Sequence, residues 1–302
     1  MTENQQFEVI IIGGSYAGLS AAMSLGRSMR KVLILDNNLP CNRQTPYSHN
    51  FITQDGIPPA KIAAQAKEQV LRYPTITFVS DTAISGTKTN GSFLIATRSG
   101  KEYYSAKLIF ATGIKDQLPD IPGFADCWGI SVIHCPYCHG YEFKGQRTGI
   151  FADVAKAFHL ATLVNNLTSD LTLIIPEGAS IDTVQAEKLT RNGIKILQKE
   201  IKAVVHVNGQ LSEIVFIDDH RIPLDALYAA IPFIQSSKIP ENLGCALTES
   251  GHLDIDEFHR TNTDGIFACG DNTSPMRSVA NAVYSGNFTG AIVNKLLSDE
   301  SF

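Results

Sequence analysis

Positive charge is scarce in this sequence. Its 25 lysine and arginine residues are outnumbered by 30 aspartate and glutamate residues, which gives a net charge of -5 at pH 7. The basic residues are scattered along the chain and form no run. Because a nucleic-acid partner requires a basic surface that neutralises phosphate charge, we expect this protein to bind no nucleic acid.

Long apolar runs are also missing. No stretch reaches the roughly 18 uninterrupted apolar residues that a membrane-spanning helix needs. The first residues, MTENQQFEV, are polar and acidic, unlike the positively charged start of a secretory signal peptide. The sequence therefore predicts a soluble, cytoplasmic protein with no membrane partner.

The sequence is long enough for two domains and shows the same order of elements twice. An apolar strand over residues 7–12, a glycine turn, a helical segment and a second strand over 31–35 form the first unit. A strand over 147–151, a helix over 155–166 and a strand over 171–175 form the second unit. Such units are typical of parallel sheets, so we expect an α/β protein with two doubly wound, Rossmann-like domains.

Other segments complete this expectation. Three alternating runs, at 76–80, 83–89 and 92–98, predict an antiparallel meander, and a buried strand should follow at 107–111. A proline-rich stretch over 116–124 has the composition of a domain boundary. A long amphipathic helix should end the chain, from about 278 to 297.

The first glycine turn has the spacing of a dinucleotide-binding fingerprint. It reads Gly13-x-Ser15-x-x-Gly18, with Ser15 in place of the usual middle glycine. Such a turn lets the backbone approach a pyrophosphate, and the helix N-terminus stabilises the negative charge. Asp36 ends the second strand, where it is placed to accept a hydrogen bond from a ribose hydroxyl.

Two of the six cysteines are three positions apart, in the run HCPYCHGYE: Cys135 and Cys138. The CxxCH pattern matches a c-type haem attachment site, a partial zinc site, a structural disulfide or a redox-active dithiol. Haem attachment requires export, and a zinc site requires a second pair of ligands. Neither requirement is met by the sequence, so a redox dithiol with no metal is favoured.

These motifs together resemble the low-molecular-weight thioredoxin reductase family over nearly the whole chain. The resemblance rests on GGSYAG with Asp36, the ATG of 111–113, LPDIPG, GISVIHCPYCHGYE and GIFACGD. It implies an FAD domain made of residues 1–116 and 245–302. It also implies an inserted central domain, residues 117–244, that carries the CxxC motif, and a homodimeric assembly.

The resemblance also implies roles for individual residues. Cys138 matches the thiol that faces the flavin, and Cys135 matches the thiol that meets the substrate. Positions that match FAD-binding residues lie in the glycine turn, the HNF run, the ATG run and the C-terminal motif. They are Gly13, Ser15, Ala17, Gly18, Asp36, Asn50, Thr112, Gly113, Asp271, Arg277 and Ala280.

The sequence departs from the family next to the second cysteine. The family has an aspartate there as acid/base, whereas this chain has His139, with His134 before the first cysteine. An imidazole with a pKa near neutral can take a thiol proton and return it, although either histidine is also compatible with a packing role. The CPYCHGYE form resembles the branch that includes gliotoxin-type dithiol oxidases.

The family's NADPH site is also altered. Where the family has a glycine-rich turn and an arginine-rich run, this chain has Ala152-Asp153-Val154-Ala155 and Ile175-Pro176-Glu177-Gly178. The sequence therefore predicts a flavoprotein that exchanges electrons between FAD and a thioredoxin-like protein or small-molecule dithiol without NADPH. Its further electron partner would be O2, a ferredoxin or a second flavin. The alternative is a conventional NADPH-dependent thioredoxin reductase.

Overall fold

A computed structural model describes residues 5–89 and 91–302 of the chain. The chain divides into two compact units. Unit 1 consists of Met1–Arg43, Ile57–Lys115 and Phe233–Phe302, and unit 2 consists of Gln44–Gly56 and Asp116–Pro232. The first expected boundary, at 116/117, lies next to the observed division. The second, at 244/245, lies further along the chain than the observed one, and residues 44–56 group with unit 2.

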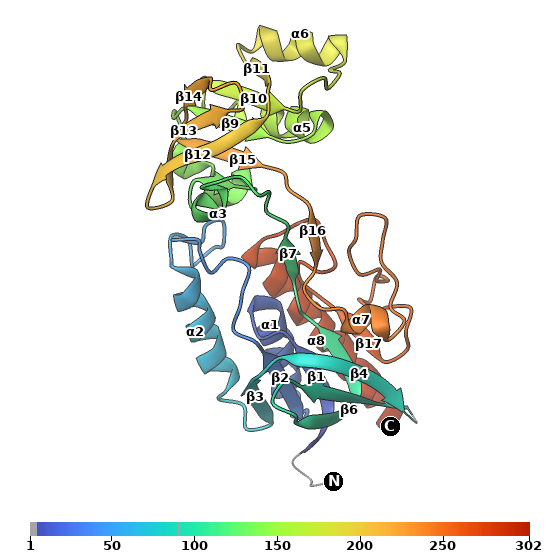
Figure 1. Cartoon of the computed structure of the whole chain (residues 1–302). Coiled ribbons are helices and arrows are strands. Elements are labelled where there is room, and N and C mark those ends of the chain that lie inside the picture. The colour runs from blue at the N-terminus through green and yellow to red at the C-terminus, as the bar shows by residue number, and fades with distance from the viewer. Residues whose placement is uncertain (1–4, 90) are drawn as a thin grey trace. The chain divides into compact units, whose positions relative to one another are not determined.

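Unit 1 is built on a seven-stranded mixed sheet (Figure 1). The strand order is β3-β2-β1-β6-β5-β4, and β17 also pairs with β6. The strands are β1 (Gln6–Ile12), β2 (Val32–Asp36), β3 (Ile76–Ser80), β4 (Ala83–Thr89), β5 (Ser92–Thr97), β6 (Glu102–Phe110) and β17 (Ile266–Ala268). The helices are α1 (Tyr16–Arg27), α2 (Pro59–Val70), α7 (Ile239–Asn242) and α8 (Val279–Ser301), and β7 (Ile114–Asp116) pairs with β16 (Phe233–Gln235).

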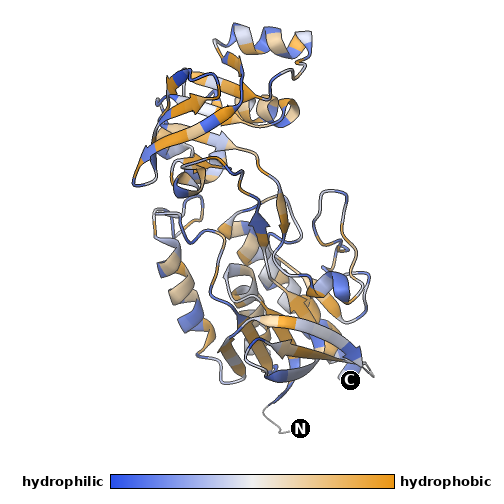
Figure 2. Cartoon of the chain, in the orientation of Figure 1, coloured by the Kyte–Doolittle hydropathy of each residue, from blue (hydrophilic) through white to orange (hydrophobic). Residues whose placement is uncertain are grey.

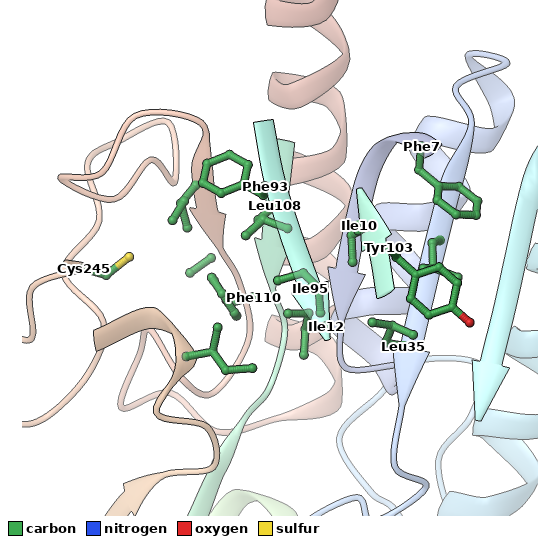
Figure 3. Packing of buried hydrophobic residues seen from close by; sticks show 14 of the residues in the cluster. Phe7, Ile10, Ile12, Leu35, Phe93, Ile95, Tyr103, Leu108, Phe110 and Cys245 are labelled. Atoms are coloured by element: carbon green, nitrogen blue, oxygen red, sulfur yellow. The ribbon is translucent and has the colours of Figure 1, made fainter. Parts of the chain in front are cut away.

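The centre of this sheet is apolar because helices or loops cover both of its faces. Val9, Ile10 and Ile11 of β1 have no exposed surface, and neither have Leu33 and Ile34 of β2 or Leu108 and Ile109 of β6. Figure 3 shows how residues of β1, β2, β5 and β6 form one core with loop residues such as Cys245. This rigid sheet positions the loops at the carboxyl ends of its parallel strands.

Helices α1 and α8 pack closely because small residues line their contact. A Cβ atom on Gly286 of α8 would lie 2.0 Å from the carbonyl oxygen of Ala17 on α1. A Cβ atom on Gly290 would lie 2.5 Å from the carbonyl oxygen of Ala21. Only glycine permits this approach, so α8 fixes the position of the first turn of α1.

One expectation for this unit is wrong. Residues 76–80 were expected in an antiparallel meander, but β3 pairs with β2 in parallel, at the edge of the sheet. The antiparallel part consists of β4, β5 and β6 instead. An edge strand with one covered face has the same alternating pattern in either direction, so the pattern alone misassigned the partner.

Unit 2 contains the second expected doubly wound sheet. Its five parallel strands run in the order β11-β10-β9-β15-β8, and an antiparallel sheet, β12-β13-β14, adjoins it in sequence. The strands are β8 (Val132–Ile133), β9 (Thr148–Phe151), β10 (Leu171–Ile175), β11 (Lys195–Gln198), β12 (Ile201–Val207), β13 (Gln210–Phe216), β14 (Arg221–Pro223) and β15 (Ala226–Ala229). The helical segments are α3 (Phe124–Cys127), α4 (Pro136–His139), η2 (Tyr141–Phe143), α5 (Val154–Val164) and α6 (Thr183–Arg191).

The hydropathy of the chain follows these layers. Figure 2 shows apolar residues concentrated in the sheets of both units, whereas α6 is largely polar. Among the described residues, no helix has the combination of length and apolar character that crossing a bilayer requires. The α/β class with two Rossmann-like sheets is confirmed.

Candidate functional site

The glycine turn of unit 1 brings the start of α1 against β1 and β6. Gly13 has a φ of 107°, and a Cβ atom there would lie 2.1 Å from the carbonyl oxygen of Ala111. A Cβ atom on Gly18 would lie 1.8 Å from the carbonyl oxygen of Gly13. Both positions therefore require glycine for the close approach, as expected from the fingerprint.

Among the described residues, no carboxylate caps the first turn of α1. Ser15 occupies the N-cap in an extended conformation, its side chain makes no capping hydrogen bond among the described residues, and the first turn contains no acidic residue. The first N–H groups of a helix need acceptors and attract negative charge. This helix start, which includes Ala17, fits the pyrophosphate of a dinucleotide.

Asp36 closes the same turn from the end of β2. Its Oδ1 accepts a hydrogen bond from the backbone N–H of Gly14 at 2.9 Å, and its Oδ2 accepts one from Asn38 at 3.2 Å. The carboxylate is therefore held beside the glycine turn. A role in binding a ribose hydroxyl stays a prediction.

The C-terminal motif forms a second part of the unit 1 site. Asp271 follows β17, and its Oδ2 lies 4.0 Å from Nε of Arg277 in the segment that leads to Ala280 on α8. Both charged side chains are only 15% exposed. Thr112, which precedes Gly113 at the end of β6, accepts a 3.4 Å hydrogen bond from the Asn272 amide.

Three buried polar residues in this region were not identified from the sequence. They are Gln235, His252 and Asn272, and each is at most 5% exposed. Gln235 Oε1, His252 Nε2 and Asn272 Oδ1 are buried and make no hydrogen bond within the described residues. Only the position of Asn272 directly after GIFACGD was a signal in the sequence.

These unsatisfied atoms suit a bound polar group, because burying such atoms without partners is costly. Gln235 donates to the backbone carbonyls of Gly251 and Asn272, which ties the three residues into one cluster next to Thr112. Burial, together with the charge of Arg277, lowers the pKa of His252 below the ordinary imidazole value. The residues present therefore fit FAD: the start of α1 would accept its phosphates, and the buried atoms of this cluster would pair with polar atoms of the bound nucleotide.

The CxxC motif lies on a single helical turn in unit 2. Cys135 is the N-cap of α4, and its carbonyl oxygen accepts hydrogen bonds from the N–H groups of Cys138 and His139, both at 3.3 Å. Pro136 begins the helix, where its missing N–H has no cost. Both cysteines are half-buried, and Tyr137 between them is 67% exposed. The two cysteines therefore lie on one short turn, and each is partly accessible.

Other groups surround this turn. The Tyr228 hydroxyl lies beside Gly140, and the residue is 1% exposed. Burial raises the pKa of Tyr228, and the Cys135 thiol and the Glu142 carboxylate raise it further. Burial and the neighbouring His49 lower the pKa of His139 to about 4, which is below the near-neutral value expected for an imidazole acid/base. His134 packs its ring against Trp128, at 6.2 Å between centroids.

Asn50 lies in unit 2, whereas the other expected FAD-binding residues all lie in unit 1. Asn50 has a φ of 58°, and its N–H donates a 2.8 Å hydrogen bond to Asp55 Oδ1. Its expected contact with the flavin nucleotide stays a prediction.

The starts of α5 and α6 in unit 2 differ from that of α1. Asp153 caps α5 by accepting from the N–H of Lys156 at 3.0 Å, and it also pairs with the Lys156 ammonium at 2.8 Å. Asp182 caps α6 by accepting from the N–H groups of Val184 and Gln185. A carboxylate therefore already occupies each position where a phosphate would bind.

No group of three or more His, Cys, Asp or Glu side chains among the described residues is arranged to hold a metal ion.

Comparisons with known proteins identify the family of this chain. A family model for pyridine nucleotide-disulphide oxidoreductases matches residues 7–286. The thioredoxin reductase tcpT of Claviceps purpurea is 31% identical over 312 residues, which cover 99% of this chain and 97% of that protein. A putative thioredoxin reductase TrxB from Bacillus anthracis has a TM-score of 0.93 at 30% identity and covers 98% of this chain and 100% of its own. An oxidoreductase from Agrobacterium tumefaciens has a TM-score of 0.91 at 35% identity, with 97% and 99% coverage. This chain therefore belongs to the pyridine nucleotide-disulphide oxidoreductase family, as an FAD-binding enzyme of thioredoxin reductase type.

Proposed function

We propose that this enzyme exchanges two electrons between a substrate dithiol and FAD through Cys135 and Cys138, without NADPH. The observation that carries the proposal is the contrast between the two glycine-turn positions. Helix α1 begins with an uncapped serine, whereas α5 begins with a capping aspartate. One helix start is suited to a dinucleotide phosphate, and the other is not.

The cost of binding NADPH at α5 supports this proposal. A pyrophosphate there would compete with the Asp153 carboxylate for the same N–H groups and would meet its negative charge. Displacing an aspartate cap costs about 1 kcal/mol, before any repulsion between the charges. The turn after β10 contributes Glu177 and no arginine, so it offers no charge-assisted donor for a 2′-phosphate.

The chemistry assigned to the cysteines is thiol–disulfide exchange. A substrate thiolate attacks the Cys135–Cys138 disulfide, the second substrate thiol closes the substrate disulfide, and both enzyme thiols are released. When bound, FAD supplies the acceptor for the two electrons of the enzyme dithiol. Following the family resemblance, Cys135 meets the substrate and Cys138 meets the flavin, while His139 accepts a thiol proton.

The final electron partner is proposed to be O2, a ferredoxin or a second flavin. With O2, the two electrons and two protons taken from the substrate dithiol leave as hydrogen peroxide. With a reduced ferredoxin, the same residues operate in reverse and reduce a thioredoxin-like protein. We further propose a cytoplasmic homodimer.

The second candidate function is a conventional NADPH-dependent thioredoxin reductase. It is favoured by the intact β9-α5-β10 unit of parallel strands, which retains the architecture of a nucleotide-binding domain, and by relatives named thioredoxin reductase.

Anaerobic reduction of the flavin distinguishes the two functions. The holoenzyme is mixed with NADPH or with dithiothreitol, and the visible flavin absorbance is followed. We expect bleaching by dithiothreitol and none by NADPH. Rapid bleaching by NADPH would refute the loss of the nucleotide site. Cys138→Ser should abolish bleaching by dithiothreitol. Cys245→Ser should retain it, because Cys245 is buried in unit 1, where its thiol donates a hydrogen bond to the Thr261 hydroxyl.

A further inference from the structure

The proposed proton acceptor, His139, is poorly suited to hold a proton. Both of its ring nitrogens are buried, and neither has a hydrogen-bond partner within the described chain. Burial and the nearby His49 lower its pKa to about 4. An imidazole in this environment is neutral near pH 7, so a proton that it takes from a thiol must move on quickly.

His49 is close enough to His139 to act on its charge, and it is flanked by two carboxylates, one of which, Glu142, follows His139 by three residues. Its Nε2 lies 3.4 Å from Glu142 Oε1, and its Nδ1 lies 3.6 Å from Asp55 Oδ1. The His49 side chain is 19% exposed, whereas those of Glu142 and Asp55 are 38% and 68% exposed. A proton on either nitrogen of His49 therefore faces a carboxylate that reaches solvent.

The loop that carries His49 is held in place by its own hydrogen bonds. Asp55 Oδ1 accepts from the N–H of Asn50, and the N–H of Gly56 donates to the carbonyl oxygen of Ser48, at 2.8 and 2.9 Å. Asn50 and Thr53 both have positive φ values, of 58° and 73°. Non-glycine residues in this conformation cost energy and persist where the surroundings fix them.

Glu142 contacts His49 and belongs to the same short segment of chain as the cysteines. It follows His139 by three residues, on η2, and its carboxylate acts together with the Cys135 thiol on the buried Tyr228 hydroxyl. The groups that surround His49 and His139 are thus Asp55 from the loop, Glu142 from η2, Cys135 at the N-cap of α4, and Tyr228 from β15. All of them lie in unit 2.

We infer that His49, clamped between Glu142 and Asp55, is a positioning residue that takes the thiol proton from His139 and delivers it to solvent during dithiol oxidation. For each dithiol oxidised, two electrons pass to FAD and two protons leave the thiols. One of these protons would be taken up by the reduced flavin, and the other moves from the thiol to His139, then to His49, then through Glu142 or Asp55 to water. This inference rests on the proposed function.

The test compares pH profiles of anaerobic flavin reduction by dithiothreitol. His49→Gln keeps the shape and polarity of the side chain but cannot carry a proton. General acid–base groups contribute about 100-fold to 10,000-fold, and we expect a relay variant to lose about tenfold or more near pH 7. We also expect one ionisation to disappear from the profile and the rate to recover with added imidazole buffer.

Two variants provide controls. Glu142→Gln should lower the rate in the same direction and respond to imidazole, and Glu142→Asp should restore part of it. His220→Gln removes an exposed histidine of the β13–β14 turn in the same unit and should leave the profile unchanged. FAD content and melting temperature establish that each variant is folded.

The two possible failures are distinguishable. If dithiothreitol does not reduce the wild-type flavin, the proposed function fails. If wild type is reduced and Cys138→Ser is not, but His49→Gln has the wild-type profile or shows no response to imidazole, the inference about His49 is overturned and the proposed function stands.

Discussion

Replacing Gly18 by alanine should displace the start of α1 and weaken FAD binding. The new Cβ atom would lie 1.8 Å from the carbonyl oxygen of Gly13, whereas ordinary contacts begin at 3.4 Å. The obstacle is backbone, so no side-chain rotation relieves it, and the helix start must move by about 1.6 Å. A shift of this size breaks hydrogen bonds between the helix N-terminus and a phosphate.

The expected magnitudes follow from this geometry. Overpacking costs about 1–3 kcal/mol, and the better helix propensity of alanine returns about 1 kcal/mol. We therefore expect Gly18→Ala to lower the free energy of unfolding of the apoprotein by up to about 2 kcal/mol. The affinity for FAD should fall by at least tenfold, since each lost factor of ten corresponds to about 1.4 kcal/mol.

Gly26→Ala is the matched control because it lies in the same helix. Its Cβ atom would approach only side-chain atoms of Tyr73 and Ile76, at 3.0 Å or more. It should stay within about 1 kcal/mol of wild type and keep its FAD affinity. Urea unfolding and quenching of FAD fluorescence measure the two quantities. Equal FAD affinity in Gly18→Ala and wild type would refute the assignment of this turn to the pyrophosphate.

Three further predictions concern unit 2 and the thiols. Asp153→Ala should lower the free energy of unfolding by about 1 kcal/mol through loss of the α5 cap, measured by urea unfolding, without making the flavin reducible by NADPH. Hydrogen bonds from Arg147 hold the pKa of Asp225 below its usual range. The pair therefore stabilises the folded protein at pH values above the ordinary carboxyl pKa of about 3.9, and this stabilisation is lost as the pH falls toward the lowered pKa. Asp225→Asn should therefore flatten the loss of stability in acid, by less than about 1 kcal/mol because both partners are partly exposed. A thiol reagent should modify the exposed Cys41 in the native protein but leave Cys269 unmodified until unfolding, because burial raises the pKa of Cys269 to about 12.

The parts of the fold that sequence patterns predicted are those set by local interactions. The glycine turn directly joins the apolar strand β1 to α1, so the sequence pattern predicted the order and the packing of these elements. The partner of β3 was not readable, because parallel and antiparallel edge strands share one alternating pattern.

The candidate site likewise contains some features that local sequence encodes and others that depend on long-range contacts. Gly13, Gly18 and the CxxC turn are contiguous motifs, and the structure gives them the expected local geometry. The cluster of Gln235, His252 and Asn272, by contrast, is formed by loops whose polar residues are common in any sequence. His49 approaches Glu142 across more than ninety residues of chain, and no local pattern records such a pairing. The polar cluster and the His49–Glu142 pair are both formed by residues that come together only in the folded structure.

The division of the chain into two units also limits which fragments of this protein can fold when they are expressed separately. The backbone passes between units 1 and 2 at residues 43/44, 56/57, 115/116 and 232/233. A gene fragment that encodes only residues 116–232 would retain both cysteines but would lose the short excursion 44–56, and with it His49. The segment that carries the cysteines is therefore not a complete structural unit when it is expressed or fused on its own. Fusion partners, truncations and circular permutants of this enzyme must carry the N-terminal excursion along with the central segment.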